Sequence, residues 1–312
     1  MKIILAGGSG QIGRILASTF HARGDEVVIL SRRPNCLNDP WRTTSWDPTE
    51  IDGSDIVINL AGRSVDCRYT PANRAEILSS RVDSTLALGR AIAAAKRPPS
   101  LWLQSSTATI YSHRYDAPND ETTGILGGSE PNAPDTWKFS ITVAKAWEAS
   151  FDLCDVPCRK VALRSAMVMS PHHGGVFDVL LRLVRFGLGG RAGDGRQYVS
   201  WIHERDFVQA LLWLIEHKDF AGPVNLASPG PVPNADFMRT LRQAWGGMPI
   251  GLPAMEWMVE IGAFVLRTES ELILKSRRVV PGRLVNAGFQ FEYANWSSAA
   301  ADLCRRWRSA TV

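Results

Sequence analysis

Apolar runs and helically spaced apolar positions alternate along the first half of the chain. Residues 2–6 form a short apolar run that ends in glycines, and apolar residues at positions 12, 15, 16 and 20 then recur at the spacing of one helix face. The same order of strand and helix repeats downstream and predicts a doubly wound parallel α/β sheet. The expected strands cover residues 26–31, 43–46, 56–60, 101–105 and 158–164, and the expected helices cover residues 11–23, 71–95 and 136–153.

The second half of the chain has a less regular pattern. Helical spacing is expected over residues 176–186, 204–217 and 234–245 and over most of the segment from 252 onward. A strand near 222–227 is expected to return to the sheet and complete it. Residues 1–165 are therefore interpreted as the α/β domain and residues 166–312 as a smaller, mostly helical lobe. Because no linker-like stretch separates the two parts, we expect the lobe to pack on the first domain.

Composition narrows the class of protein. The chain has 312 residues, of which 45% are hydrophobic and 21% charged, and its net charge is +4. The Lys and Arg residues are scattered rather than clustered, which argues against a nucleic-acid partner. No apolar stretch is long enough, or free enough of charge, to span a membrane, and no signal-like segment opens the chain. We expect a cytoplasmic protein that binds neither nucleic acid nor membrane.

The cysteines do not indicate a metal site. There are five of them, and Cys154 and Cys158 lie four positions apart. No second pair of Cys or His residues follows at a spacing that would complete a zinc site. We expect reduced thiols and no bound metal.

The first strand–helix junction carries a G-x-x-G-x-x-G motif, formed by Gly7, Gly10 and Gly13. One glycine permits the tight turn, another lets the backbone approach a pyrophosphate, and the third lets the helix pack closely on the strand. The N-terminus of the helix favours anions because its N–H groups are unpaired. The motif predicts a dinucleotide site that also includes Ser9, Gln11 and Ile12. The alternative is a tight turn without a ligand.

The end of the second strand indicates which dinucleotide is bound. A site for NAD usually has Asp or Glu there, which accepts hydrogen bonds from the adenosine ribose. This strand ends instead in Ser31, Arg32 and Arg33. A hydroxyl followed by guanidinium groups would bind a 2′-phosphate, which an acid would repel. NADP(H) is therefore favoured over NAD(H), although the two arginines could also be solvated loop cations.

Several motifs together carry a resemblance to a known family. The early glycine motif, NLAG at 59–62 and SSTATIY at 105–111 resemble the extended short-chain dehydrogenase/reductase superfamily. More narrowly, the chain resembles its epimerase-like SDR39U1/YfcH-type subgroup. The features that match this subgroup are SRVDST at 80–85, AWE at 146–148, the run from 187 to 203, VPGRL at 280–284 and GFQF at 288–291.

The resemblance implies an NADP(H)-binding Rossmann domain over residues 1–165, with a substrate cleft under the lobe. It also implies a small helical C-terminal domain at about 249–296. By position, Ser31 and Arg32 would meet the adenosine phosphate and Asp47 would lie near the adenine. The central part of the cofactor would be lined by Leu60, Ala61 and Gly62, and Glu76 and Arg81 match cofactor-contacting positions. Glu76 and Arg81 could instead form a pair on a solvated helix face.

The catalytic Tyr-x-x-x-Lys pair of that superfamily is absent. Its two positions, counted from Glu148, fall on Ser140 and Ala144, and none of the five tyrosines is followed by lysine four residues later. Lys145 lies one residue away, about 100° around the helix, and could otherwise be an exposed lysine. Tyr111 at the end of the fifth strand could supply a phenol, with Thr107 four residues before it, or could be a packed tyrosine.

The sequence thus predicts an NADP(H)-binding protein that acts as a reductase, epimerase or dehydratase on a small polar substrate. The missing catalytic pair motivates an alternative, a non-catalytic NADP(H)-binding redox sensor or scaffold. By analogy with extended members of the superfamily, the helices at 71–95 and 136–153 are candidates for a homodimer interface.

Overall fold

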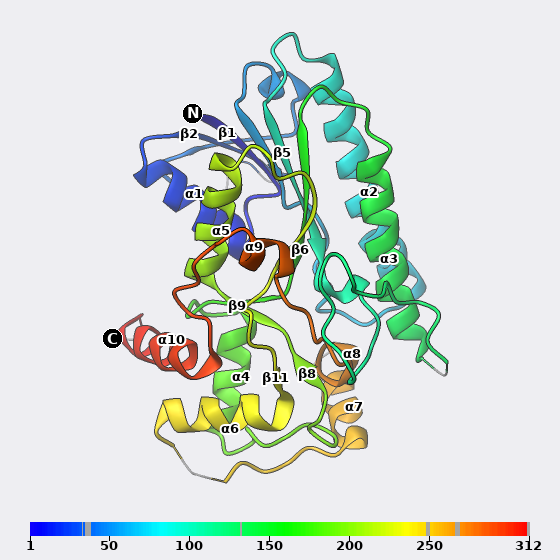
Figure 1. The fold of residues 1–312 in the computed structure, drawn as a ribbon, viewed down its shortest axis with the longest axis vertical. Helices are drawn as coiled ribbons and strands as arrows, with labels where there is room; N and C mark the ends of the chain where they lie inside the picture. Colours follow the sequence, from blue (N-terminus) through cyan, green and yellow to red (C-terminus); the bar gives the residue numbers. More distant parts are fainter. Residues whose placement is uncertain (33, 35–38, 132, 248–249, 266–268, 311–312) are drawn as a thin grey trace.

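A parallel sheet occupies the centre of the upper half of the molecule in Figure 1. The computed structural model describes residues 1–32, 34, 39–131, 133–247, 250–265 and 269–310. Within them, seven strands pair in parallel in the order β10-β6-β5-β4-β1-β2-β3. They are β1 (Lys2–Ala6), β2 (Glu26–Leu30), β3 (Arg42–Thr44), β4 (Ile56–Asn59), β5 (Leu101–Thr107), β6 (Arg159–Ser165) and β10 (Gly222–Leu226). The strand order reverses between β1 and β4, the point where doubly wound sheets bind ligands.

The two faces of the sheet are covered by different helices. Alternate residues of a strand point to opposite faces, so Ile3 packs with α1 (Gln11–Ala22) and α5 (Glu204–Glu216). Its neighbour Ile4 packs with α2 (Pro71–Ala94) and α3 (Asp135–Asp152) instead. Figure 1 shows the two helix layers on opposite sides of the strands. The expected doubly wound architecture is confirmed.

Helix α2 begins where the sequence supplies a capping residue followed by a proline. Thr70 accepts a hydrogen bond from the N–H of Asn73 at 3.3 Å, and Pro71 takes the first helical position, where an N–H is not needed. Tyr69 therefore stands directly before the helix. Its ring packs edge to face on Phe139 of α3, with centroids 5.0 Å apart.

The lower half of the molecule has a core of its own. Helices α4 (Val176–Arg185), α6 (Asn234–Trp245) and α10 (Trp296–Ala310) pack around Trp201, Phe237 and Trp296. Short paired strands flank this core, β7 (Met167–Met169) with β9 (Trp201–His203) and β8 (Tyr198–Val199) with β11 (Val232–Pro233). The later segments include α7 (Glu256–Val265), α8 (Glu271–Leu274) and α9 (Gly282–Asn286). The C-terminal part is mostly helical, as predicted.

Several strands and helices end at other residues than predicted. β5 extends to Thr107 rather than ending at 105, because its pairing with β6 continues as far as Ser165. The predicted return of a strand near 222–227 to the sheet is confirmed, because β10 pairs with β6, and α5 packs on the sheet as well. The layers of the first domain are therefore assembled from two separate parts of the chain.

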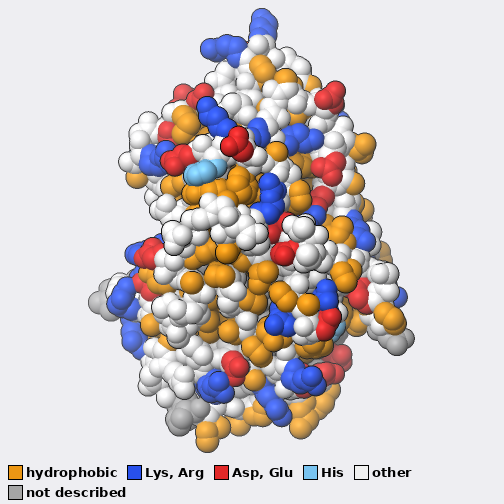
Figure 2. Space-filling model, in the orientation of Figure 1, with side chains coloured by type: hydrophobic (Ala, Val, Ile, Leu, Met, Phe, Trp, Pro, Cys, Tyr) orange, Lys and Arg blue, Asp and Glu red, His pale blue; other side chains and the backbone are white. Residues whose placement is uncertain are grey.

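Charges of both signs are mixed on the face of the molecule that Figure 2 shows. On the face drawn in Figure 2, Lys and Arg side chains are interspersed with Asp and Glu. In the described parts of the chain, no helix combines the length and the apolar character that crossing a membrane requires.

Candidate cofactor and substrate site

The three glycines of the first turn occupy three different environments. Gly7 has a φ of +73°, and a Cβ there would lie 2.5 Å from the Cα of Ala61. A Cβ on Gly13 would lie 2.2 Å from the carbonyl oxygen of Gly8, so this glycine lets α1 pack closely on the turn that follows β1. A Cβ on Gly10 would meet nothing within 4 Å. The turn, the close packing and the open approach expected of a dinucleotide loop are thus all present.

The N-terminus of α1 is suited to a diphosphate. Gly10 caps the helix without a side-chain hydrogen bond, which leaves N–H groups of the first turn available to an anion. The Nε2 of Gln11 is buried and has no hydrogen-bond partner among the described residues. Ser9 is exposed beside this opening, whereas Ile12 packs against the core. These residues fit the dinucleotide that the motif implies.

The residues expected to determine the cofactor preference lie at the end of β2. Ser31 is buried, and its N–H donates to a carbonyl of β3 at 2.9 Å. Arg32 is exposed immediately beyond it, while Arg33 lies outside the described residues. A cation therefore stands where an acid would mark a site for NAD.

Asp47 is engaged in a local turn. Its carboxylate accepts hydrogen bonds from the N–H and the hydroxyl of Thr49, at 2.9 and 2.7 Å, and so caps a short 3₁₀ helix, η2 (Pro48–Ile51). These hydrogen bonds lower the pKa of Asp47. A contact between Asp47 and an adenine stays a prediction.

The segment after β4 crosses the glycine loop. The N–H of Leu60 donates to the last carbonyl of β1 at 2.8 Å, and Ala61 stands against Gly7. A Cβ on Gly62 would lie 3.2 Å from the guanidinium carbon of Arg81. This segment connects the diphosphate end of the site to a cavity further along the edge of the sheet.

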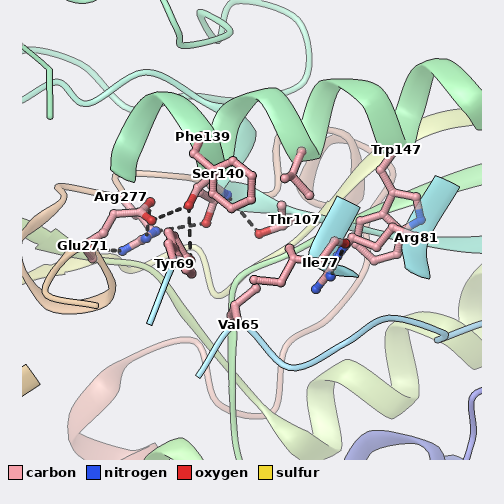
Figure 3. A pocket seen from close by; sticks show the side chains of 12 residues that line it. Val65, Tyr69, Ile77, Arg81, Thr107, Phe139, Ser140, Trp147, Glu271 and Arg277 are labelled. Atoms are coloured by element: carbon pink, nitrogen blue, oxygen red, sulfur yellow. Dashed lines mark hydrogen bonds and ion pairs between the residues drawn. The ribbon is translucent and has the colours of Figure 1, made fainter. Parts of the chain in front are cut away.

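That cavity has a volume of about 120 Å³ and lies between α2, α3, the end of β5 and the C-terminal part of the chain. Its apolar lining comes from Val65, Ile77, Phe139, Val143 and Trp147, and its polar lining from Tyr69, Arg81, Thr107, Thr109, Ser140, Glu271 and Arg277 (Figure 3).

One end of the cavity holds a connected polar group. The hydroxyl of Tyr69 lies 3.4 Å from Ser140 Oγ, and the hydroxyl of Ser140 donates to the carboxylate of Glu271. The guanidinium of Arg277 pairs with the same carboxylate at 3.2 Å and donates from Nε to Thr109 Oγ1 at 3.2 Å. Burial raises the pKa of Tyr69 to about 12, so its phenol is protonated at neutral pH.

The other end of the cavity holds a cation without an acid. The Nη1 of Arg81 donates to two backbone carbonyls, at 3.0 and 2.9 Å, and its guanidinium lies 5.0 Å from the centroid of the Trp147 ring. No carboxylate of the described residues pairs with it, and burial lowers its pKa. A largely buried guanidinium of this kind favours an anionic ligand.

The sequence profile of the NAD dependent epimerase/dehydratase family matches residues 3–227, and that of a domain of unknown function, DUF1731, matches residues 256–303. The chain belongs to the NAD-dependent epimerase/dehydratase family.

Full-length relatives support this membership. The chain is 34% identical over 310 residues to epimerase family protein SDR39U1 of Bos taurus, a match that covers 97% of this chain and 99% of the relative. The human protein of that name is 31% identical over the same length, with the same coverage of both chains. An epimerase family protein of Staphylococcus aureus (strain MW2) is 28% identical over 312 residues, covering 97% and 99% of the two chains.

Solved structures extend the likeness to the whole fold. The crystal structure of human SDR39U1 (isoform 2) with NADPH matches with a TM-score of 0.85 and 28% identity, over 98% of this chain and 99% of that one. A nucleoside-diphosphate sugar epimerase from Corynebacterium glutamicum matches with a TM-score of 0.74 and 26% identity, over 97% of this chain and 58% of that one.

For this member of the epimerase/dehydratase family, the structure brings one of the three catalytic candidates to the cavity. Thr107 lines it. Tyr111 follows a 3₁₀ turn, η3 (Ala108–Ile110), rather than ending β5, and its buried hydroxyl donates to Asn225 at 3.0 Å and accepts from Arg164 at 2.9 Å. Lys145 is exposed on α3 and does not line the cavity. Tyr111 and Lys145 are therefore placed as a packed tyrosine and a surface lysine.

The two cofactor-contacting candidates on α2 also have different surroundings. Glu76 is exposed and pairs with Arg63, whereas Arg81 turns into the cavity. The alternative of a Glu76–Arg81 pair on a solvated face is wrong, because the two side chains have different partners.

Tyr69, Glu271 and Arg277 were not singled out from the sequence. They lie in a connection before α2 and in the C-terminal region, and no local spacing relates them. Only the packing of α8 and its following segment against α3 brings them together. The described residues hold no group of three or more His, Cys, Asp or Glu side chains placed to bind a metal ion.

Proposed function

We propose that this protein binds NADP(H) along the carboxyl edge of its sheet and acts as a reductase, epimerase or dehydratase on a small polar substrate. The observation that carries the cofactor part is the open space above Gly10 at the N-terminus of α1, together with the Nε2 of Gln11, which no described residue contacts by a hydrogen bond. A diphosphate there would meet the N–H groups of the first turn. The likeness to human SDR39U1, crystallised with NADPH, supports the proposal.

The preference for the phosphorylated dinucleotide follows from the end of β2. Ser31 and the exposed Arg32 would hold the 2′-phosphate, and no acid stands at this point to repel it. Leu60, Ala61 and Gly62 would line the middle of the cofactor.

The nicotinamide end would face the cavity, where the cofactor supplies the chemistry of hydride transfer. The hydroxyl of Thr107 accepts one hydrogen bond, from Thr109 N–H at 3.2 Å, which leaves its proton available to a substrate oxygen. Arg81 offers a positive charge at the same cavity. Both groups would favour a polar or anionic ligand.

The size of the cavity limits the reacting part of the substrate. Its volume of about 120 Å³ is smaller than a cavity of roughly 150 Å³ that holds benzene. Its walls are apolar apart from the hydroxyl, carboxylate and guanidinium groups already described. A small carbonyl or hydroxyl compound suits this space.

Fluorescence titration with NADPH and NADH tests the cofactor proposal. We expect NADPH to bind at least about tenfold more tightly, because a charged hydrogen bond to the 2′-phosphate contributes about 1.5–3 kcal/mol. Arg32→Glu is expected to remove this preference, whereas Arg23→Glu at the opposite end of α1 keeps it. Equal, weak binding of both nucleotides by the wild-type protein would contradict the proposal.

One observation favours the non-catalytic alternative. The tyrosine and lysine positions of the related enzymes are occupied here by Ser140 and by Ala144, which is fully buried. A panel of small aldehydes, ketones and nucleotide sugars, followed by NADPH oxidation, separates the two functions. Turnover supports the enzyme, and tight NADPH binding without any turnover supports a redox sensor or scaffold.

A further inference from the structure

We propose that the phenol of Tyr69 exchanges a proton with the substrate oxygen, and that Ser140 and Glu271 relay this proton. The inference rests on the proposed function, because it needs a substrate whose oxygen gains or loses a proton during hydride transfer. Its basis is the set of contacts at one end of the cavity (Figure 3), where side chains from three separate segments meet.

The hydrogen bonds in this set have a direction. The hydroxyl of Ser140 donates to the carboxylate of Glu271, which only accepts when it is ionised. The hydroxyl of Tyr69 lies 3.4 Å from Ser140 Oγ. Since the serine proton is directed at the carboxylate, the phenol is the donor of this contact. A proton taken from the substrate can therefore pass from phenol to hydroxyl to carboxylate.

The carboxylate at the end of the relay is buried and charge-compensated. Glu271 is 1% exposed and Arg277 is 9% exposed, and their side chains pair at 3.2 Å. Arg277 contacts one carboxylate oxygen and Ser140 the other. The second oxygen is therefore the one that receives a proton from the cavity.

A second hydroxyl is available to the same substrate oxygen. Arg277 donates to Thr109 Oγ1, and the N–H of Thr109 donates to Thr107 Oγ1, each at 3.2 Å. Thr107 thus uses an acceptor position within the protein and keeps its proton for a ligand. Because Thr107 and Tyr69 line one cavity, a substrate oxygen can meet both.

Tyr69 is held in place from its backbone. Its N–H donates to the carboxylate of Glu269 at 2.7 Å, and its ring packs on Phe139. Glu269 and Glu271 both belong to the region that matches the domain of unknown function. This domain therefore has a chemical role, in which one acid positions the phenol and the other receives its proton.

The proton and hydride transfers involve only the substrate, NADP(H) and the three side chains. When an alcohol is oxidised, its hydroxyl proton moves to the Tyr69 oxygen while the phenolic proton moves to Ser140 and the serine proton moves to Glu271. The carbon–hydrogen bond breaks with its electron pair going to NADP⁺, and the carbon–oxygen double bond forms. Reduction of a carbonyl runs the same transfers in reverse, with protonated Glu271 as the source of the proton.

The first test compares two tyrosine variants on a substrate that the wild-type protein turns over. Tyr69→Phe is expected to lower kcat by about a hundredfold or more, as for loss of a general acid–base group, with little change in KM or in NADPH affinity. Tyr115→Phe, a change to a half-exposed tyrosine outside the cavity, serves as the control and keeps full activity. If Tyr69→Phe retains more than half of the wild-type kcat, the inference is overturned.

The second test needs no substrate. In protein labelled with ¹³C at tyrosine Cζ, the resonance missing from Tyr69→Phe reports the hydrogen bonding of this phenol. At neutral pH, Ser140→Ala is expected to shift this resonance, because the phenol loses the oxygen to which it donates. Glu271→Gln is expected to shift it as well, because a neutral amide replaces the carboxylate to which Ser140 donates. A resonance unmoved by both changes overturns the relay.

The two proposals fail in different ways. Wild-type turnover that survives Tyr69→Phe leaves the proposed enzyme standing and removes the inference. Tight NADPH binding without turnover of any compound in the panel removes the enzyme and the role of Tyr69 together. Loss of NADPH binding in the wild-type protein removes the cofactor proposal itself.

Discussion

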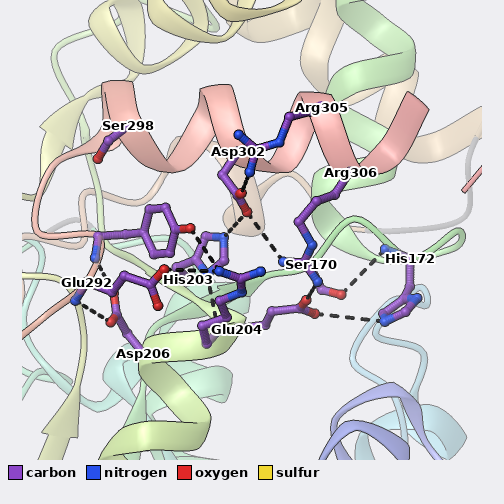
Figure 4. A network of polar contacts seen from close by, with 12 residues as sticks. Ser170, His172, His203, Glu204, Asp206, Glu292, Ser298, Asp302, Arg305 and Arg306 are labelled. Atoms are coloured by element: carbon purple, nitrogen blue, oxygen red, sulfur yellow. Dashed lines mark hydrogen bonds and ion pairs between the residues drawn. The ribbon is translucent and has the colours of Figure 1, made fainter. Parts of the chain in front are cut away.

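Two buried polar clusters connect the C-terminal region to the rest of the molecule, and they are built from the same kinds of side chain. The pocket cluster consists of Tyr69, Ser140, Glu271 and Arg277. The histidine cluster consists of His203, Glu204, Asp302 and Arg306, which join the start of α5 to α10 (Figure 4). Each places at least one buried carboxylate next to an arginine.

The clusters differ in what their polar atoms face. In the histidine cluster, His203 is fully buried, its Nδ1 accepts the N–H of Arg205 at 3.1 Å, and its Nε2 contacts Asp302 at 3.2 Å. Both ring nitrogens are thus used within the protein, and the ring stacks on Tyr293. The pocket cluster instead lines a cavity and presents hydroxyl groups to it. Burial and acid–base groups are common to both, so the open space is what marks a candidate site.

The largest expected effect is on stability and concerns the histidine cluster. Asp302→Ala removes a nearly buried carboxylate that contacts His203, Arg305 and Arg306. Losing one partner of a buried charged group should lower the free energy of unfolding by about 3–5 kcal/mol. Glu292→Ala, at a half-exposed pair with Arg205, should cost less than about 1 kcal/mol. Urea denaturation measures the free energy of unfolding of both variants. Similar losses would show that the buried cluster contributes no more to stability than the half-exposed pair.

The histidine cluster should also make stability depend on pH. Burial lowers the pKa of His203 to about 4, because a charged imidazolium is poorly solvated in the protein interior. An unfolded histidine titrates near 6.5, so the unfolded state gains a proton first as the pH falls. Stability that is complete above pH 6.5 should decline by about 3 kcal/mol toward pH 4.

Comparing the pH dependence of stability in the wild-type protein and in His203→Gln separates the contribution of His203 from that of the carboxylates. Urea midpoints at pH 7 and pH 4.5 should differ less in His203→Gln than in the wild-type protein. His21→Gln, at an exposed histidine in α1, should leave the wild-type pH dependence intact. Equal pH dependence in all three proteins would show that His203 is not held neutral by burial.

In the pocket cluster the effect should fall on turnover. Ser140→Ala interrupts the relay and should lower kcat by about tenfold to a hundredfold, while the free energy of unfolding changes by only about 1 kcal/mol. Thr142→Ala, an exposed site on the same helix, should change neither quantity. A large loss of stability without loss of kcat would make the pocket cluster structural, like the histidine cluster.

The smallest expected effect on turnover is at Tyr111, which the sequence offered either as a catalytic candidate or as a packed tyrosine. Tyr111→Phe removes buried hydrogen bonds to Asn225 and to the charged Arg164 and should cost about 1–3 kcal/mol of stability. Since the hydroxyl does not line the cavity, kcat should stay within about twofold of the wild-type value. A kcat reduced as strongly as that expected of Tyr69→Phe would reverse the assignment of the two tyrosines.

The features that could be predicted from the sequence are those encoded within a short stretch. Gly7, Gly10 and Gly13 follow an apolar strand directly, so their roles in turn, approach and packing can be inferred from spacing, and the doubly wound sheet follows from the repeated order of strands and helices. Ser31 and Arg32 were likewise placed by their position at the end of β2.

The other end of the site could not be predicted, because it depends on contacts between distant segments. Tyr69 meets Ser140 across 71 positions, and Ser140 meets Glu271 across 131. For Tyr111, a local feature rather than a distant contact made the predicted position at the end of the strand wrong. The short turn after Thr107 redirects the chain, and strand periodicity alone does not reveal such a turn.

The most direct test of the account is a crystal structure of the protein with NADPH. We expect the diphosphate over Gly10, the 2′-phosphate on Arg32, and the nicotinamide at the cavity beside Thr107 and Tyr69. A dinucleotide bound elsewhere, or a nicotinamide directed away from this cavity, would contradict it.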